Sequence, residues 1–395
     1  MIGKMKKNWP VKKLGEVCKT GAGGTPLKSR REYYDGGNIP WLLSGEVAQG
    51  EIRESKKFIT QAGLDNSSAK VFPVNTVLVA MYGATAGQVG ILRFKAATNQ
   101  AVCGIFPSDQ FVPEFLFYLL LSRKDELVSK AAGNAQPNIS QLKIKATKIP
   151  TPPLEEQRRI VGILNEAFEG IATAKANAEK NLQNARALFD SHLNDVFSQK
   201  GKGWVETTLG TAAEVQSGGT PSRQKKHYWS GDTPWYSSGE LNEIYTSDPE
   251  RKITKEGLGN SNAKLFPEGS LLIGMYDTAA LKMSILDRDG TFNQAIAGVK
   301  PNEKVDVEFV LHAINAVKPK LLLERRGVRQ KNLSLGKIKE IVIPLPILTE
   351  QRLVVEGLSK VMAETQRLAA IYERKVELLE ELKKSLLQRA FNGEL

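Results

Sequence analysis

The order of hydrophobic and polar positions divides the chain into segments of two kinds, which alternate along the sequence. From 154 to 197 and from 348 to 391 there is no proline and little glycine, and apolar or small residues recur at alternating spacings of four and three. This spacing places them on one stripe of a helix, as in a heptad seam. The pattern therefore predicts two long helices that pair along their stripes. The expected pairing residues are Ile160, Leu164, Ile171, Val354, Leu358, Leu368, Leu379, Leu382 and Leu386.

The other two segments are rich in glycine, proline, aromatic residues and short β-branched runs. Runs such as 74–79 and 270–273 are typical of strands bounded by turns, whereas 114–130 and 308–324 are typical of helices. These segments are therefore expected to form globular α/β modules.

One unit is written twice along the chain. Gly23-Gly24-Thr25-Pro26 recurs as Gly218-Gly219-Thr220-Pro221, and after the loss of one residue the later matches keep an offset of 194. The later matches include Pro40-Trp41 with Pro234-Trp235, Ser44-Gly45-Glu46 with Ser238-Gly239-Glu240, Asn99-Gln100-Ala101 with Asn293-Gln294-Ala295, Ile149-Pro150 with Ile343-Pro344, and Glu156-Gln157-Arg158 with Glu350-Gln351-Arg352. A constant offset over this span predicts two tandem copies.

The repeat predicts four parts: a module at 1–153, a helix at 154–200, a module at 201–347 and a helix at 348–395. Either the helices pair with each other or each packs on its own module. We favour pairing, because roughly 40 helical residues extend about 60 Å, too long for one small module. The connectivity then requires antiparallel pairing. The expected fold is α+β, with two pseudo-two-fold-related globular domains separated by a coiled-coil-like helical spacer.

The basic excess of the chain lies in its globular segments. The 395 residues carry a formal net charge of +12, which alone decides little about a partner. Residues 1–153 carry +10 and 201–347 carry +3, whereas 154–200 carry −1 and 348–395 carry 0. Two basic modules joined by a neutral spacer suit double-stranded nucleic acid contacted at two places through its phosphates.

Basic and amide residues cluster at corresponding places in the two copies. Arg and Lys bind phosphate and guanine, and Asn and Gln bind adenine. A solvated charged face is the alternative for any single cluster. The candidate DNA-contacting residues of the first copy are Lys28, Arg30, Arg31, Tyr33, Arg53, Lys56, Lys57, Asn134, Gln136 and Asn138. Those of the second copy are Arg223, Lys225, Lys226, Tyr228, Arg251, Lys252, Arg325, Arg326, Arg329, Gln330, Lys331 and Asn332.

The Gly-Gly-Thr-Pro loops have two interpretations. Their backbone N–H groups would suit a phosphate, but the loops lack the P-loop pattern, so a tight turn is at least as well supported. Trp41 and Trp235 each follow a proline in an apolar run, which favours core packing over base stacking.

The sequence contains none of the familiar catalytic or metal-binding patterns. Its two cysteines and three histidines show no ligand spacing, and the tetrapeptide typical of amino-methyltransferases is absent. A nuclease-like set of Asp232, Glu250 and Lys252 is not reproduced in the first copy. We therefore expect no catalytic residues, no metal site and no cofactor bound by this chain. No apolar run is long enough to span a membrane, so we expect a cytoplasmic protein.

The chain resembles the specificity subunit of type I restriction–modification systems. The resemblance rests on the ordered, duplicated motifs: Gly-Gly-Thr-Pro, Pro-Trp-x-x-Ser-Gly-Glu, Asn-Gln-Ala and the Ile-Pro-x-Pro-x-x-x-Glu-Gln-Arg entry into each long helix. The terminal Phe391-Asn392-Gly393-Glu394-Leu395 adds to it. It covers essentially the whole chain.

This resemblance implies two target-recognition domains, each reading one half of an asymmetric bipartite DNA site, with the paired helices setting the gap. It implies a non-catalytic subunit that binds two methyltransferase subunits, which use S-adenosylmethionine. Motor–nuclease restriction subunits, which use ATP and Mg²⁺, complete the implied complex. The alternative is a DNA nuclease or methyltransferase carrying its own specificity modules.

Overall fold

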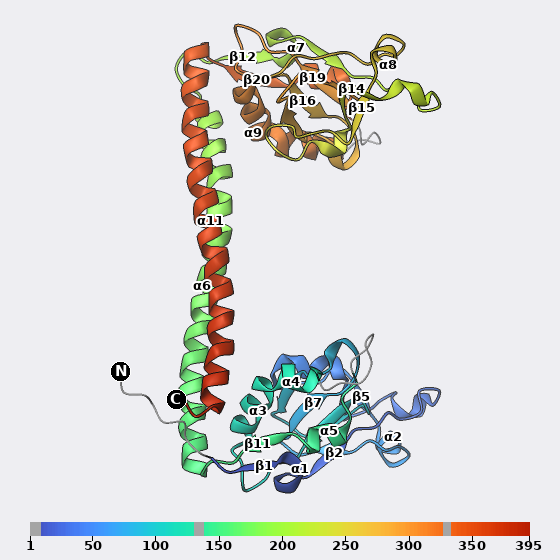
Figure 1. Cartoon of the computed structure of the whole chain (residues 1–395), viewed down its shortest axis with the longest axis vertical. Coiled ribbons are helices and arrows are strands. Elements are labelled where there is room, and N and C mark those ends of the chain that lie inside the picture. The colour runs from blue at the N-terminus through green and yellow to red at the C-terminus, as the bar shows by residue number, and fades with distance from the viewer. Residues whose placement is uncertain (1–8, 130–137, 327–332) are drawn as a thin grey trace. The chain divides into compact units, whose positions relative to one another are not determined.

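The computed structural model describes residues 9–129, 138–326 and 333–395, without the side chains of 277 and 324–326 (Figure 1). The chain divides into two compact units. Unit 1 comprises Met1–Ala178 and Arg374–Leu395, and unit 2 comprises Glu179–Glu373. Each unit contains one globular module and portions of two long helices.

Short strands and short helices build module 1. Its strands are β1 (Val11–Lys13), β2 (Thr20–Ala22), β3 (Ile39–Leu42), β4 (Glu51–Ile52), β5 (Phe58–Ile59), β6 (Val71–Phe72), β7 (Val77–Ala80), β8 (Val89–Leu92), β9 (Ala96–Thr98), β10 (Val102–Ile105) and β11 (Lys148–Pro150). Its helices are α1 (Leu14–Val17), α2 (Gln61–Asp65), α3 (Pro113–Ser122), α4 (Lys124–Ser129) and α5 (Gln141–Lys145), with 3₁₀ turns η1 (Arg31–Tyr33), η2 (Ser44–Gln49) and η3 (Gly83–Thr85).

The largest sheet of module 1 has the strand order β2-β10-β7-β8-β4. Its neighbours are antiparallel, except that β4 runs parallel to β8. A second sheet has the order β5-β3-β9-β6, and β1 pairs with β11. Strands β7, β8 and β10 are buried at every position. This explains why they read as continuous apolar runs and not as alternating patterns.

Module 2 repeats this construction. Its strands are β12 (Val205–Thr208), β13 (Val215–Ser217), β14 (Trp229–Tyr236), β15 (Arg251–Ile253), β16 (Leu271–Gly274), β17 (Met283–Ile285), β18 (Thr291–Phe292), β19 (Ile296–Val299) and β20 (Val342–Leu345). Its helices are α7 (Leu209–Ala212), α8 (Lys255–Gly259), α9 (Val307–Arg326) and α10 (Leu335–Lys339), with 3₁₀ turns η4 (Lys226–Tyr228), η5 (Ser238–Glu240) and η6 (Asp277–Ala279).

The sheet order of module 2 confirms the tandem repeat. Its main sheet, β13-β19-β16-β17, has the same order as β2-β10-β7-β8, and β12 pairs with β20 as β1 pairs with β11. The third sheet has the order β15-β14-β18. In the place of the β4–β8 pair, the described residues of module 2 have an isolated parallel bridge between Tyr245 and Ile285.

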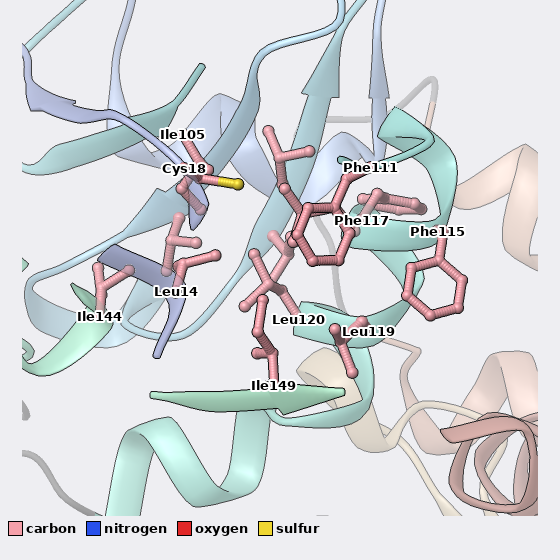
Figure 2. Close-up of a cluster of buried hydrophobic side chains, with 14 of the residues drawn as sticks. Leu14, Cys18, Ile105, Phe111, Phe115, Phe117, Leu119, Leu120, Ile144 and Ile149 are labelled. Carbon is pink, nitrogen blue, oxygen red and sulfur yellow. The ribbon is translucent and has the colours of Figure 1, made fainter. Parts of the chain in front are cut away.

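The core of unit 1 lies between the main sheet, helix α3 and the ends of the long helices. Leu14, Ile105, Phe115, Leu120 and Ile149 come from four different elements and lie together in it (Figure 2). The core also includes residues of both long helices, among them Leu164 and Phe391. The corresponding core of unit 2 includes Phe197, Phe309 and Leu358. Each module is therefore packed against the helix ends beside it.

The two long helices are α6 (Leu154–Gln199) and α11 (Leu348–Phe391), close to their predicted bounds. Within unit 1, Arg159 donates to the backbone oxygen of Leu395, and Lys175 lies 2.5 Å from Glu380. As the residue number rises along α6, the number of the contacting residue at the C-terminal end of the chain falls. The two helices are therefore antiparallel in this unit. The α+β class with two long antiparallel helices is confirmed.

One predicted seam residue lies outside the seam. Ile160, Leu164, Ile171 and Leu358 are buried, and Val354, Leu368, Leu379 and Leu386 are half-buried, but Leu382 is 47% exposed. The alternating spacing continues from Leu379 to position 383, one residue beyond Leu382. Lys383 occupies that position, half-buried, with its Nζ 5.2 Å from the centre of the Phe168 ring. A lysine stem packs along an apolar surface while its charge meets the ring face.

The predicted helix at 114–130 is interrupted. Helix α3 ends at Ser122, and α4 begins at Lys124. The Ser122 hydroxyl donates to the backbone oxygen of Leu119, which also accepts from the backbone N–H of Arg123 at 3.2 Å, so two donors share this acceptor where α3 ends. The matching segment of module 2 is the continuous helix α9, so the two modules differ at this place.

Candidate nucleic-acid interface

A hollow in module 1 joins two basic segments that are separate in the sequence. Its lining includes Lys28, which follows the Gly-Gly-Thr-Pro loop, and Lys56 and Lys57, which precede strand β5. Tyr34 and Trp41 also line this hollow. All three lysines are exposed, and none has an ion pair with a described residue. We call this site basic hollow 1.

Module 2 has a hollow at the corresponding place, which we call basic hollow 2. It is lined by Arg223 on one segment and by Arg251 and Lys252 on the other, together with Trp229 and Glu250. These basic side chains are exposed and have no ion pair among the described residues. Both modules thus place basic side chains from the same two segments around a concave surface.

The hollows lie beside a framework that the two copies share. Trp41 and Trp235 are buried, as expected, and their Nε1 groups donate to the backbone oxygens of Gly24 and Gly219, each at 3.0 Å. A Cβ atom on Gly24 would lie 2.3 Å from the backbone nitrogen of Ala69. The glycine is therefore required for close backbone approach.

The hydrogen bonds of the Gly-Gly-Thr-Pro loops favour the tight-turn interpretation over the phosphate cradle. The backbone N–H groups of Gly23 and Gly24 donate to the backbone oxygens of Val102 and Thr98. Gly218 and Gly219 donate in the same way to Ile296 and Phe292. These donors are occupied within each module, so they are not available to a phosphate.

The shared Asn-Gln-Ala segment contributes an exposed amide that sequence reasoning did not select. The Thr25 hydroxyl donates to Oε1 of Gln100, and the Thr220 hydroxyl donates to Oε1 of Gln294 at 2.5 Å. Both glutamines are exposed. The repeat could have identified these glutamines from the sequence, because Thr25 and Gln100 recur as Thr220 and Gln294.

The other candidate DNA-contacting residues that the structure describes are not among those that line the hollows. Arg30 is paired with Glu32, and Arg53 with Glu51, yet both arginines remain exposed. Asn138 is exposed and forms an isolated antiparallel bridge with Tyr82. The remaining exposed or half-buried candidates are Arg31 and Tyr33 on η1 of module 1, and Lys225 and Lys226 at η4 of module 2.

Tyr228 is 3% exposed, so its ring packs inside module 2 and presents little surface to a partner. Lys225 donates to the Tyr228 hydroxyl at 2.9 Å, and this hydrogen bond raises the pKa of the lysine. Tyr228 is thus placed as a packing residue that supports a basic side chain. Several candidates lie outside the described residues or have side chains outside them: Asn134, Gln136, Arg325, Arg326, Arg329, Gln330, Lys331 and Asn332.

Burial shifts the pKa values of the two cysteines and of His312 in directions that leave all three groups uncharged near neutral pH. Cys18 and Cys103 are free and buried, and burial raises the pKa of the first thiol to about 11 and that of the second to about 12. Thiols with such pKa values remain protonated near neutral pH and are poor nucleophiles. Burial lowers the pKa of His312 to about 4, so its imidazole is neutral at pH 7.

The described part of the chain contains no group of three or more His, Cys, Asp or Glu residues placed to hold a metal ion. Across the same residues, no helix is both long enough and apolar enough to cross a membrane.

Known proteins resemble this chain in sequence and in fold. The family model "Type I restriction modification DNA specificity domain" matches residues 6–183 and 201–375. The type I restriction enzyme MjaIX specificity subunit of Methanocaldococcus jannaschii is 27% identical over 290 residues, which is 69% of this chain and 67% of that relative.

Two solved structures share the fold at 20% sequence identity. A chain from work on complex assembly and conformational transition of the type I R-M system has a TM-score of 0.79, covering 99% of this chain and 100% of that chain. The HsdS subunit from Thermoanaerobacter tengcongensis has a TM-score of 0.69, covering 100% of this chain and 99% of that chain. The likeness extends over both modules and both long helices.

Proposed function

Because this chain belongs to the type I restriction modification DNA specificity family, we propose that each basic hollow binds the DNA of one half of an asymmetric bipartite site. The observation that carries the proposal is the repeated placement of basic side chains. Lys28, Lys56 and Lys57 in one module and Arg223 and Arg251 in the other surround matching hollows. Exposed Lys and Arg side chains on a concave surface suit the phosphates of a duplex.

The family is that of the specificity subunit, a non-catalytic component of type I systems, so the alternative of a self-contained nuclease or methyltransferase is not favoured. Purified chain incubated with DNA, Mg²⁺ and labelled S-adenosylmethionine tests this directly. We expect neither cleavage nor methyl transfer. Turnover by the isolated chain would overturn the assignment.

The antiparallel helices α6 and α11 are proposed to act as the spacer between the two DNA-reading modules. With the adjoining module surfaces, they would also bind two methyltransferase subunits. In this proposal S-adenosylmethionine is bound by those subunits, ATP and Mg²⁺ by motor–nuclease subunits, and no cofactor by this chain. The complex would act on DNA in the cytoplasm.

Exchange of one module tests the modular reading. Methylome sequencing of a host that expresses this chain with its methyltransferase defines the target. Replacing residues 1–153 by the corresponding module of another member should change one half of the methylated motif. Replacing 201–347 is the matched control and should change the other half. If either exchange alters both halves, the modules do not read separately.

An in-register deletion tests the spacer. Residues 172–178 and 377–383 each form one heptad and include Lys175 and Glu380, which pair across the seam. Removing both heptads shortens each helix by about 10 Å. At about 3.4 Å per base pair, the gap between half-sites should shrink by about three base pairs. Deleting only one of the two is the control, since it breaks the register. An unchanged gap in a functional double deletion would refute the spacer role.

A further inference from the structure

The glutamate of each Ser-Gly-Glu motif makes the same long-range contact in both modules. In module 1, Oε2 of Glu46 accepts a hydrogen bond from the backbone N–H of Leu43 at 2.9 Å, and Oε1 accepts from the backbone N–H of Lys56 at 3.0 Å. The Glu46 side chain is 8% exposed. One carboxylate therefore joins two backbone segments that both line basic hollow 1.

Module 2 repeats the contact at the offset of 194. Oε1 of Glu240 accepts from the backbone N–H of Glu250 at 2.9 Å, and Oε2 accepts from both the N–H and the hydroxyl of Ser237 at 2.7 Å. Glu250 lines basic hollow 2 and directly precedes Arg251 and Lys252. In both copies the carboxylate thus holds the backbone at the start of the basic segment.

We propose that Glu46 and Glu240 are positioning residues for DNA binding, which set the backbone of Lys56-Lys57 and Arg251-Lys252 so that these side chains meet the phosphates. This inference rests on the proposed function of the hollows. The carboxylate suits the task because each of its oxygens accepts hydrogen bonds. Its fixed backbone contacts order the loop before DNA arrives, which reduces the entropy lost on binding.

The positioning role predicts a change in DNA affinity opposite to the change that simple electrostatics predicts. Glu46 adds a negative charge close to a surface that would bind a polyanion. If charge alone mattered, Glu46→Gln would tighten DNA binding, because it removes that charge. The N–H groups of Leu43 and Lys56 meet different oxygens of Glu46, whereas an amide has one acceptor oxygen and one donor nitrogen, so in Glu46→Gln one of the two N–H groups would face a donor. Loss of either contact releases one side of the hollow, and the positioning role predicts weaker binding.

The test measures binding of the full-length chain, assembled with its methyltransferase, to a duplex carrying its methylated motif over a series of salt concentrations. The variants are Glu46→Gln, Lys56→Gln/Lys57→Gln and the triple combination. Glu54→Gln is the matched control, because Glu54 is an exposed carboxylate on the same loop. Each phosphate contact contributes about 0.9 to the slope of log affinity against log salt.

We expect Lys56→Gln/Lys57→Gln to lower the slope by up to about 1.8, and Glu46→Gln to weaken binding and lower the slope in the same direction. Glu54→Gln should bind as tightly as the parent or more tightly. The triple variant should bind within about twofold of the double variant, since residues that act through one another are not additive.

The outcomes separate the two proposals. If the lysine variant binds as the parent does, basic hollow 1 does not bind DNA and the proposed function of that surface fails. If the lysine variant weakens binding but Glu46→Gln behaves like Glu54→Gln, or if the triple variant is additive, the positioning role fails alone. Should Glu46→Gln not fold, Glu240→Gln gives the same test in module 2.

In that second test, the Glu240 side chain is only half-buried, so its replacement disturbs the core less. Arg251→Gln/Lys252→Gln is then the charge-removal variant, and exposed Glu243→Gln is the matched control. The expected and contrary results are the same as for module 1.

Discussion

The buried glutamine of each Glu-Gln-Arg motif should be a main determinant of how a long helix joins its module. Gln157 lies at the start of α6 with no exposed surface. Its Oε1 accepts from the backbone N–H of Val112 at 2.8 Å, and its Nε2 donates to the backbone oxygens of Gln110 and Pro152, each at 2.9 Å. One amide thus connects α6 to the loop that begins helix α3.

Gln157→Leu keeps the approximate volume but removes all three hydrogen bonds. It leaves the Val112 N–H and two carbonyl groups without their partner. An unsatisfied buried donor or acceptor costs about 1–3 kcal/mol, and the gain from burying leucine offsets part of the total. We expect a loss of about 3 kcal/mol in the unfolding free energy of unit 1. Gln183→Leu replaces an exposed glutamine of α6 and should change stability by less than about 0.5 kcal/mol.

Denaturant unfolding and hydrogen exchange together measure this effect. Exchange of the peptide containing the Val112 amide should accelerate, because that N–H loses its acceptor. The repeat supplies an independent replicate: Gln351 accepts from Asp306 N–H at 2.8 Å and donates to the backbone oxygens of Lys304 and Pro346. Gln351→Leu should therefore destabilise unit 2 by a similar amount. If both leucine variants unfold like the Gln183→Leu control, the buried amide has no such role.

Three further predictions concern other features of the modules. Gly24→Ala should destabilise unit 1 by about 1–3 kcal/mol in thermal unfolding, since its Cβ meets backbone, whereas Gly45→Ala, with open space around it, should be nearly neutral. Hydrogen bonding to Arg93 lowers the pKa of Glu51. The stability that results is present above the ordinary glutamate pKa and is lost as the pH falls through the lowered pKa. Arg93→Met should therefore reduce the acid dependence of the unfolding free energy, measured by urea unfolding between pH 6 and 3. Burial lowers the pKa of His312 to about 4, so between about pH 6.5 and 4 the unfolded state binds a proton that the folded state does not. The unfolding free energy should therefore fall by about 1.4 kcal/mol per pH unit as the pH drops through this range. His312→Phe should abolish that slope.

The long helices and the repeat were predictable because each rests on a pattern spread over many residues. A heptad stripe of forty residues tolerates local exceptions, and so the bounds of α6 and α11 followed closely from the sequence. Single positions were less secure. Leu382 is apolar, which favours a seam position, but the register places Lys383 there. Hydrophobicity alone does not distinguish a seam residue from an exposed leucine one position away.

The basic hollows were not predictable from spacing alone. Lys28 and Lys56 are far apart in the sequence, and only the packing of the Gly-Gly-Thr-Pro loop beside Trp41 brings their segments together. The roles of the repeated polar residues were hidden for a related reason. Glu46 and Gln157 look like surface residues by type, yet both bind backbone groups that are distant in the sequence. Their repetition marked them as important without showing what they contact.

The structure also limits where the charge difference between the two modules can lie. Residues 1–153 carry +10 and residues 201–347 carry +3, yet the two hollows are lined by similar sets of basic side chains. Most of the difference must therefore lie outside them. In module 2, Arg288 is paired with Asp248 and Asp287, as Arg93 of module 1 is paired with Glu51 and Glu114. Because phosphate binding depends on charges within about one Debye length, the side chains that line each hollow matter more than the net charge of the whole module. The two modules can thus bind DNA with comparable strength despite their unequal net charges, and their difference in residue type, lysine in one hollow and mainly arginine in the other, is the better place to seek different base preferences.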